Sequence, residues 1–141
     1  MRTAVDTNVI SALWSDEAQA SSIVSALAGS RERGGVVVCA PVYIELLAHP
    51  KASQSFVDRF LIETGIQVDY NLEKDIWGEA GKAFAAYAER RRRSAGGSPR
   101  RLLVDFVIGA HAMLRADQLM TLDPSRYVRD FPRLSVSETG S

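Results

Sequence analysis

The sequence predicts an α/β fold in which helices flank a central parallel sheet on both faces. Short apolar runs alternate with longer stretches of helical periodicity, and Gly or Pro separates several of them. Strands that alternate with helices in this way form right-handed βαβ units and therefore a parallel sheet. The 141 residues, 46% of them hydrophobic, are enough for one domain with its own core.

Five short apolar runs are the predicted strands. They cover residues 2–6, 36–39, 66–69, 118–122 and 134–136. The clearest of them follows two consecutive glycines and consists of three valines and a cysteine. A proline stands two residues after this run, at a position that suits the first turn of a helix. The intervals between the runs therefore have to contain the helices.

The predicted helices fill these intervals. They cover residues 8–14, 17–29, a segment from 41, 53–63, 72–92 and 98–115, with a short turn after 123–124. The last long helix is expected to begin at Ser98 and Pro99, as its cap and first residue. We expect residues 1–136 to form the domain and residues 137–141 to be a frayed tail.

Cysteine content and apolar run lengths exclude several classes of protein. Cys39 is the single cysteine, so the chain can form neither an internal disulfide nor a cysteine zinc site. Asp6 stands where a signal peptide needs an apolar core, and no run of about 18 uncharged apolar residues occurs. We expect a soluble protein of the reducing cytoplasm.

The charge is balanced overall but not locally. With 17 basic and 17 acidic residues the net charge is zero, which indicates no general affinity for a polyanion. Residues 90–104 nevertheless contain six arginines and no acidic residue. This segment is a candidate for binding an anion, but arginines near a helix C-terminus also stabilise the helix dipole, so both interpretations stay open.

Two aspartates follow predicted strands. Asp6 comes at the end of the first run, and Asp123 follows the run at 118–122. If these strands are neighbours, both carboxylates lie at the same edge of the sheet, where α/β proteins gather their ligand chemistry. Either residue could instead cap the helix or turn that follows it.

Two further acids interrupt apolar helices. Glu45 lies one turn into its helix, and it could reach solvent at the helix edge. Asp105 is the only charge in residues 102–110, a segment that is apolar on every face of its helix, so it needs a cation or hydrogen bonds to be buried there. Gly109, one turn later, would let this helix pack closely against the sheet.

Four carboxylates gathered at one sheet edge would repel one another unless a divalent cation neutralised them. Oxygen ligands suit Mg²⁺ or Mn²⁺, and the absence of a Cys/His set argues against zinc. A cation that keeps some of its waters can activate a nucleophile, and phosphodiester hydrolysis is the natural chemistry of such a site. His49 and His111 are not placed to act as the base, so we interpret them as packing or surface residues.

Four segments resemble the PIN-domain ribonucleases, and among these the VapC toxins. The segments are Ala4–Ile10, the apolar helix around Glu45, Asp105–Ala112, and Leu119–Pro124 together with Phe131–Pro132. They occur in order, at family-like spacing, and span nearly the whole chain. The resemblance implies a PIN-like three-layer sandwich with a central parallel sheet flanked by helices.

The resemblance also implies an Mg²⁺- or Mn²⁺-dependent endoribonuclease that acts as the toxin of a toxin–antitoxin pair. Its four catalytic and metal-binding positions are matched by Asp6, Glu45, Asp105 and Asp123, and its supporting polar positions by Thr121 and Asn8. An RNA substrate, a cognate antitoxin protein and a homodimer are implied as partners. No membrane is implied.

On this interpretation the arginine-rich segment becomes a candidate for contact with the RNA backbone, through Arg93, Arg100 and Arg101. The segment is unusually arginine-rich for the stretch before the third acidic residue of the family. A solvated helix end remains the alternative.

Three other functions stay open. A phosphatase of the haloacid dehalogenase type also begins with a strand that ends in aspartate, but it needs a second aspartate where this chain has Asn8. A PIN nuclease outside toxin–antitoxin systems would act in RNA processing. A non-catalytic module of the same fold would bind RNA or protein. The presence of all four acids argues against the non-catalytic module.

Overall fold

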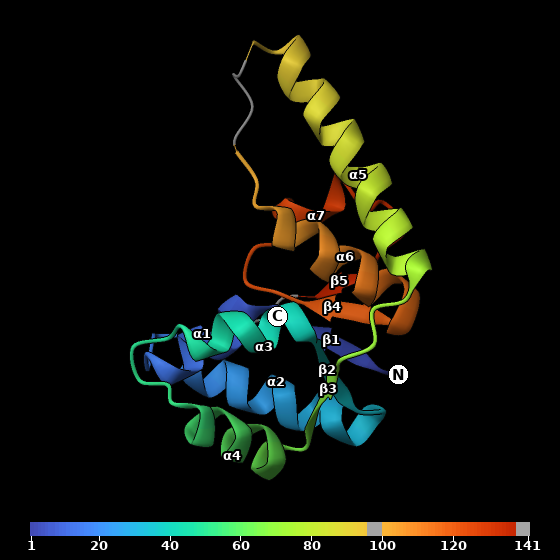
Figure 1. The fold of residues 1–141 in the computed structure, drawn as a ribbon. Coiled ribbons are helices and arrows are strands. Elements are labelled where there is room, and N and C mark those ends of the chain that lie inside the picture. Colours follow the sequence, from blue (N-terminus) through green and yellow to red (C-terminus); the bar gives the residue numbers. More distant parts are fainter. Residues whose placement is uncertain (96–99, 138–141) are drawn as a thin grey trace.

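The computed structural model describes residues 1–95 and 100–137, and in these ranges a five-stranded parallel sheet forms the centre of the fold (Figure 1). Its strand order is β3-β2-β1-β4-β5. The strands are β1 (Thr3–Val5), β2 (Val36–Cys39), β3 (Ile66–Asp69), β4 (Gln118–Met120) and β5 (Val136–Ser137). All residues of β1 and β2 are buried, as expected for central strands of a parallel sheet that is covered on both faces.

Helices cover both faces of this sheet. In the described part of the chain they are α1 (Thr7–Trp14), α2 (Ala20–Arg33), α3 (Ala40–Leu47), α4 (Gln54–Thr64), α5 (Lys74–Arg93), α6 (Leu103–Arg115) and α7 (Ser125–Val128). Figure 1 shows α1 to α4 on one side of the sheet and α5 to α7 on the other. No helix within the described ranges combines the length and the apolar character needed to cross a bilayer.

The strand order explains this division of the helices. The chain runs from β1 to β2 to β3 in one direction and then returns across the sheet to β4 and β5, on the other side of β1. Right-handed crossovers that run in opposite directions place their helices on opposite faces. The direction therefore reverses between β1 and β4, which are direct neighbours. The crevice at the carboxyl ends of these two strands is where such a sheet binds its ligands.

The predicted α/β fold with its central parallel sheet is confirmed, and the strands at 36–39 and 66–69 have the predicted bounds. β1 and β4 are shorter than predicted, because the backbone leaves the sheet for α1 and for the turn before α7. β5 begins later than predicted, since the N–H of Leu134 donates to the carbonyl of Phe131 in a preceding turn (3.0 Å). The predicted tail falls, for residues 138–141, outside the described residues.

The start of α6 differs from the prediction. Ser98 and Pro99, the expected cap and first residue, lie outside the described residues. The helix begins at Leu103, and residues 100–102 are not helical. Leu102, at the N-cap position, has an extended backbone with φ −83° and ψ 142°. The prediction of a helix that includes residues 100–102 is therefore wrong.

Contacts of Arg101 explain this late start. Its backbone N–H donates to the hydroxyl of Tyr87 (2.6 Å), and its guanidinium donates to Asp130 (3.1 Å). These contacts hold the segment against α5 and against the chain after α7. As a result Asp105 lies in the first turn of α6, where the positive end of the helix dipole stabilises a carboxylate.

Gly109 allows the C-terminal part of the chain to pack onto α6. A Cβ atom at this position would lie 2.3 Å from Cε2 of Phe131. The Phe131 ring is buried and packs against Phe106, so it has no room to move away. The close approach that we predicted at Gly109 is therefore made by an aromatic ring and not by the sheet.

We expect Gly109→Ala to lower the free energy of unfolding by about 1–3 kcal/mol, because the added methyl group overpacks the Phe131 ring. Urea denaturation followed by circular dichroism measures this change. Gly78→Ala is the matched control, since a Cβ there meets no atom within 4 Å. The free energy of unfolding of that variant should rise by about 0.5–1 kcal/mol, because alanine has a higher helix propensity than glycine. Equal stability of the two variants would contradict the packing argument.

Candidate active site at the β1–β4 edge

Asp6 lies at the carboxyl end of β1, and its side chain is buried with 3% exposure. Oδ2 accepts hydrogen bonds from the hydroxyl groups of Thr121 (2.9 Å) and Tyr127 (2.8 Å). Asp6 occupies the N-cap position of α1, yet its side chain makes no capping hydrogen bond. The capping alternative is therefore wrong for this side chain. Oδ1 has no hydrogen-bond donor among the residues that the structure describes.

The hydroxyl of Thr121 is the centre of a small network at this edge. Besides donating to Asp6, it accepts hydrogen bonds from Nδ2 of Asn8 (3.3 Å) and from the backbone N–H of Asp123 (3.1 Å). Oδ1 of Asn8 in turn accepts from the backbone N–H of Leu122 (3.2 Å). Both predicted supporting residues thus join the start of α1 to the end of β4.

Glu45 lies on α3 and is half-buried. Its Oε1 accepts a hydrogen bond from the hydroxyl of Thr7, the first residue of α1 (2.5 Å). This bond links the two helices that follow β1 and β2. Glu45 is therefore more than a solvated residue at a helix edge, because one of its oxygens is held by a neighbouring helix.

Asp105 is buried with 5% exposure, as its apolar surroundings predicted. Each of its oxygens faces a guanidinium group: Oδ2 lies 3.6 Å from Nε of Arg101, and Oδ1 lies 3.6 Å from Nη1 of Arg126. These distances are those of ion pairs and are too long for good hydrogen bonds. The buried carboxylate is thus neutralised, but neither cation holds it tightly.

Asp123 is more exposed than Asp6 and Asp105, with 42% of its side chain accessible. Its Oδ1 accepts from the hydroxyl of Ser125 (2.8 Å), and its Oδ2 pairs with Nε of Arg126 (3.3 Å). The N-cap residue of α7 is Pro124, and the backbone N–H of Arg126 donates to the backbone carbonyl of Asp123 (3.1 Å). Arg126 therefore connects Asp123 with Asp105.

The carboxylates influence one another electrostatically. Burial raises the pKa of Asp6 and the charge of Asp105 adds to this rise, while the hydrogen bonds from Tyr127 and Thr121 oppose it. Burial also raises the pKa of Glu45, and the charges of Asp6 and Asp105 raise it further. A cation placed among these groups would stabilise their ionised forms.

The chemistry of these residues fits a hard divalent cation, because all the donors are carboxylate oxygens and Oδ1 of Asp6 lacks a partner in the described part of the chain. As the side chains are placed, however, no three His, Cys, Asp or Glu residues in residues 1–95 and 100–137 form a group that could hold a metal ion. Guanidinium groups lie against Asp105 and Asp123 instead.

A cavity of about 390 Å³ opens beside this site. It is lined by Arg100, Arg101, Leu102, Asp105, Asp123, Ser125 and Arg126. Of the three arginines predicted to contact RNA, Arg100 and Arg101 therefore lie at the acidic residues. The third, Arg93, lies in the last turn of α5 and pairs with Glu89 (3.2 Å), outside this cavity.

Three residues of the site were not predicted from the sequence. Thr7 and Tyr127 donate to Glu45 and Asp6, and Arg126 pairs with two of the acids. The spacing of Arg126, three residues after an aspartate, was a signal for a local ion pair. The partners of Tyr127 could not be inferred, since 121 residues separate it from Asp6 in the sequence.

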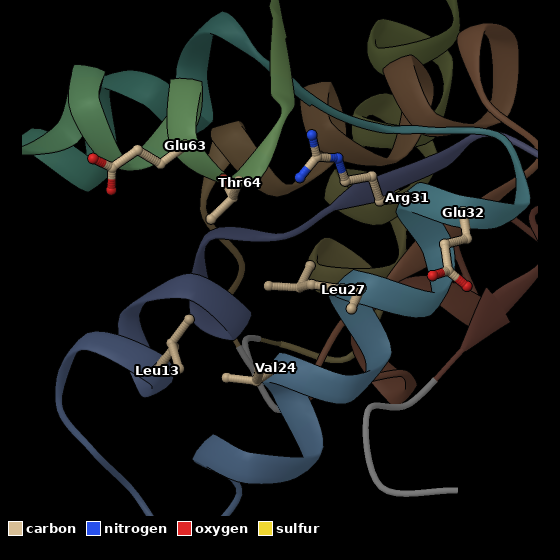
Figure 2. Close-up of a pocket in the computed structure, with 8 residues that line it drawn as sticks. Leu13, Val24, Leu27, Arg31, Glu32, Glu63 and Thr64 are labelled. Carbon is tan, nitrogen blue, oxygen red and sulfur yellow. The ribbon is translucent and has the colours of Figure 1, made fainter.

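A second pocket, of about 550 Å³, lies between α1, α2 and α4, and Figure 2 shows side chains from these three helices around it. Its lining residues are Leu13, Val24, Leu27, Ala28, Arg31, Glu32, Glu63 and Thr64. None of them is a predicted site residue. This pocket is therefore separate from the acidic site.

The raised pKa of Asp6 predicts a pH-dependent stability difference for Asp6→Asn. The folded state binds the Asp6 proton more tightly than the unfolded state, so ionisation of Asp6 destabilises the protein as pH rises above about 4. An asparagine can accept the same two hydrogen bonds without a charge. We expect a higher melting temperature for Asp6→Asn than for the wild type at pH 7, with the difference vanishing towards pH 4.

Differential scanning calorimetry in EDTA across this pH range measures the effect. Asp16→Asn removes an exposed carboxyl group elsewhere and controls for the change in net charge. A difference that is independent of pH, or equal in the two variants, would contradict the assignment to Asp6.

Comparisons with known proteins agree with this architecture. The sequence matches the family model of the PIN domain over residues 3–132. No curated protein sequence matches it significantly. Among solved structures, a chain of VapBC2 from Rickettsia felis, bound to a DNA fragment from their promoter, has a similar fold. Its TM-score is 0.72, with 18% identity over 98% of both chains.

A second similar fold occurs in VapBC-1 from nontypeable Haemophilus influenzae, with a TM-score of 0.67 and 20% identity over 100% of both chains. At such identities the likeness concerns the fold. The family match itself covers β1 to β4, all the helices of the described ranges and the four acidic residues. The chain therefore belongs to the PIN domain family.

Proposed function

We propose that the chain is a divalent-metal-dependent endoribonuclease of the VapC type, the toxin of a toxin–antitoxin pair. PIN domains are nucleases, which supports hydrolysis of phosphodiester bonds. The observation that carries the proposal is the set of carboxylates at the reversal point of the sheet. There Asp6 and Glu45 have raised pKa values, caused first by burial and then by neighbouring acids. Buried acids that influence one another in this way are typical of functional sites.

In this proposal Asp6, Glu45, Asp105 and Asp123 hold Mg²⁺ or Mn²⁺. Such an ion, when bound, polarises a phosphate oxygen and lowers the pKa of a coordinated water. Hydrogen bonds within the chain orient the ligands beforehand: hydroxyl groups fix one oxygen of Asp6 and one of Glu45. Such preorganisation is what a metal site requires of its surroundings.

RNA is the proposed substrate, and the cavity beside Asp105 and Asp123 is its proposed entry. Arg100 is exposed and lines this cavity, so its guanidinium is available for a phosphate group. Arg101 is only 15% exposed and pairs with Asp130 and Asp105, so we assign it a supporting role. Arg93 remains a candidate for a more distant contact with the backbone of a longer RNA.

A cognate antitoxin protein is the proposed partner. Both similar structures named above are VapBC assemblies, and this is the support for the toxin assignment. A homodimer and action in the cytoplasm belong to the same proposal. A non-catalytic module that binds RNA is the second candidate, because Asp105 and Asp123 are already neutralised by arginines.

Cleavage of RNA by the purified protein tests the catalytic proposal. We expect a labelled RNA to be cut in Mg²⁺ or Mn²⁺ and to stay intact in EDTA. Asp6→Asn and Asp105→Asn should each lower the rate by about 100-fold or more, because each removes a metal ligand. Asp16→Asn, purified in the same way, should cleave like the wild type. Equal rates in all three variants would indicate a contaminating nuclease or a different site, and no cleavage by any protein would favour the non-catalytic module.

Expression in bacteria distinguishes a toxin from a PIN nuclease that processes RNA. We expect induction of the wild-type chain to arrest growth and the Asp6→Asn and Asp105→Asn variants to restore it at equal protein levels, because the arrest requires cleavage. Growth curves with immunoblots for expression provide the measurement. Normal growth with an active nuclease would reject the toxin and favour the processing enzyme.

A further inference from the structure

Two guanidinium groups lie against the buried carboxylate of Asp105, one at each oxygen. A divalent cation bound at this carboxylate needs at least one oxygen free of an arginine. The two arginines differ in how firmly the rest of the protein holds them. That difference identifies which one can leave.

Arg101 is held by contacts outside the acidic site. Its Nη1 donates to Asp130 (3.1 Å), a carboxylate whose side chain is 2% exposed. Its guanidinium carbon lies 5.5 Å from the centre of the Phe106 ring, and its backbone N–H is bound by Tyr87. A side chain with an anionic partner, an aromatic neighbour and an anchored backbone stays in place when Asp105 changes partner.

Arg126 has no such anchor. In the part of the chain that the structure describes, its guanidinium pairs only with Asp105 (3.6 Å) and Asp123 (3.3 Å). Its side chain is 36% exposed and lines the cavity beside these acids. It is attached to the short helix α7, one turn after Asp123. Both of its partners are ligands in the proposed metal site.

The charge of Arg126 reaches the remaining acids as well. It opposes the rise that burial causes in the pKa of Asp6 and of Glu45. A single half-exposed cation thus acts on all four carboxylates. This is the electrostatic role that a divalent ion would take over.

We propose that Arg126 is the exchangeable internal cation of the acidic site: it neutralises Asp105 and Asp123 in the metal-free protein and is displaced when a divalent ion binds. The inference rests on the proposed metal-dependent function. Two consequences follow. Metal binding is weakened by the competing guanidinium, and the displaced guanidinium stays tethered at the cavity, where a phosphate group of RNA is the anion that it meets.

Isothermal titration of Mn²⁺ into the metal-free protein tests the competition. Arg126→Gln should bind Mn²⁺ about tenfold more tightly than the wild type, since two half-exposed ion pairs can each contribute up to a factor of about five. Arg129→Gln is the matched control. Arg129 lies three residues later, is exposed and forms no ion pair within the described ranges, so its loss changes the net charge equally without freeing an acid.

The outcomes separate this inference from the proposed function. If the wild type fails to bind Mn²⁺, the metal-dependent function itself is rejected. If the wild type binds and Asp6→Asn does not, the site stands, and Arg126→Gln then decides the inference. Equal affinity of Arg126→Gln and the wild type overturns it. So does an equal gain in Arg129→Gln, which would reduce the effect to net charge.

Nuclear magnetic resonance of the wild-type protein gives a second test that does not depend on the folding of a variant. In ¹⁵N-labelled protein titrated with Mg²⁺, the Nε–H signal of Arg126 should shift and approach that of a solvent-exposed arginine. The signal of Arg101 should stay dispersed, because its bond to Asp130 persists. An Arg126 signal that does not respond while the acidic site fills with Mg²⁺ overturns the displacement.

Discussion

Repulsion among carboxylates that are largely removed from water is the constraint on which the rest of this site depends. Asp6 and Asp105 are nearly inaccessible, and their charges raise the cost of ionising Glu45 as well. A fold selected for stability alone would place neutral side chains at this edge. The protein instead surrounds the acids with hydroxyl groups and guanidinium groups, which lower the cost without removing the charge. Tolerance of such local instability is typical of sites that have a function.

The topology of the sheet decides where the compensating groups come from. Because the strand order reverses between β1 and β4, the start of α1, the end of β4, the start of α6 and the helix α7 contribute to one small region. Asp130 extends this arrangement away from the acids. It binds Arg90 of α5 and Arg101 before α6, and so ties the long helix to the chain that leads into the first turn of α6. The geometry of Asp105 therefore depends on residues that touch none of the four acids.

Much of this could be predicted from local pattern. The valine run of β2 and the alternating Ile66 and Val68 of β3 predicted these strands with correct bounds, and the apolar surroundings of Asp105 correctly indicated its burial. The start of α6 could not be predicted in this way, because local capping chemistry at Ser98 and Pro99 is overridden by tertiary contacts of Arg101. The hydrogen bond from Tyr127 and the ion pair between Arg126 and Asp105 could likewise not be predicted, because contacts between residues far apart in the sequence leave no periodic pattern in it. Capping, the obvious alternative for Asp6, is excluded only by the direction of its side chain.

The hydrogen bond between Tyr127 and Asp6 has a consequence for the order of events during synthesis. Asp6 is synthesised before its partner, which follows 121 residues later in the chain. β4, which supplies Thr121 and lies beside β1, is also made late. A nascent chain therefore carries its first carboxylate long before the hydroxyl groups that orient it exist. The arrangement around Asp6 therefore cannot form during synthesis until the chain has been made as far as Tyr127, which makes it a late event in folding.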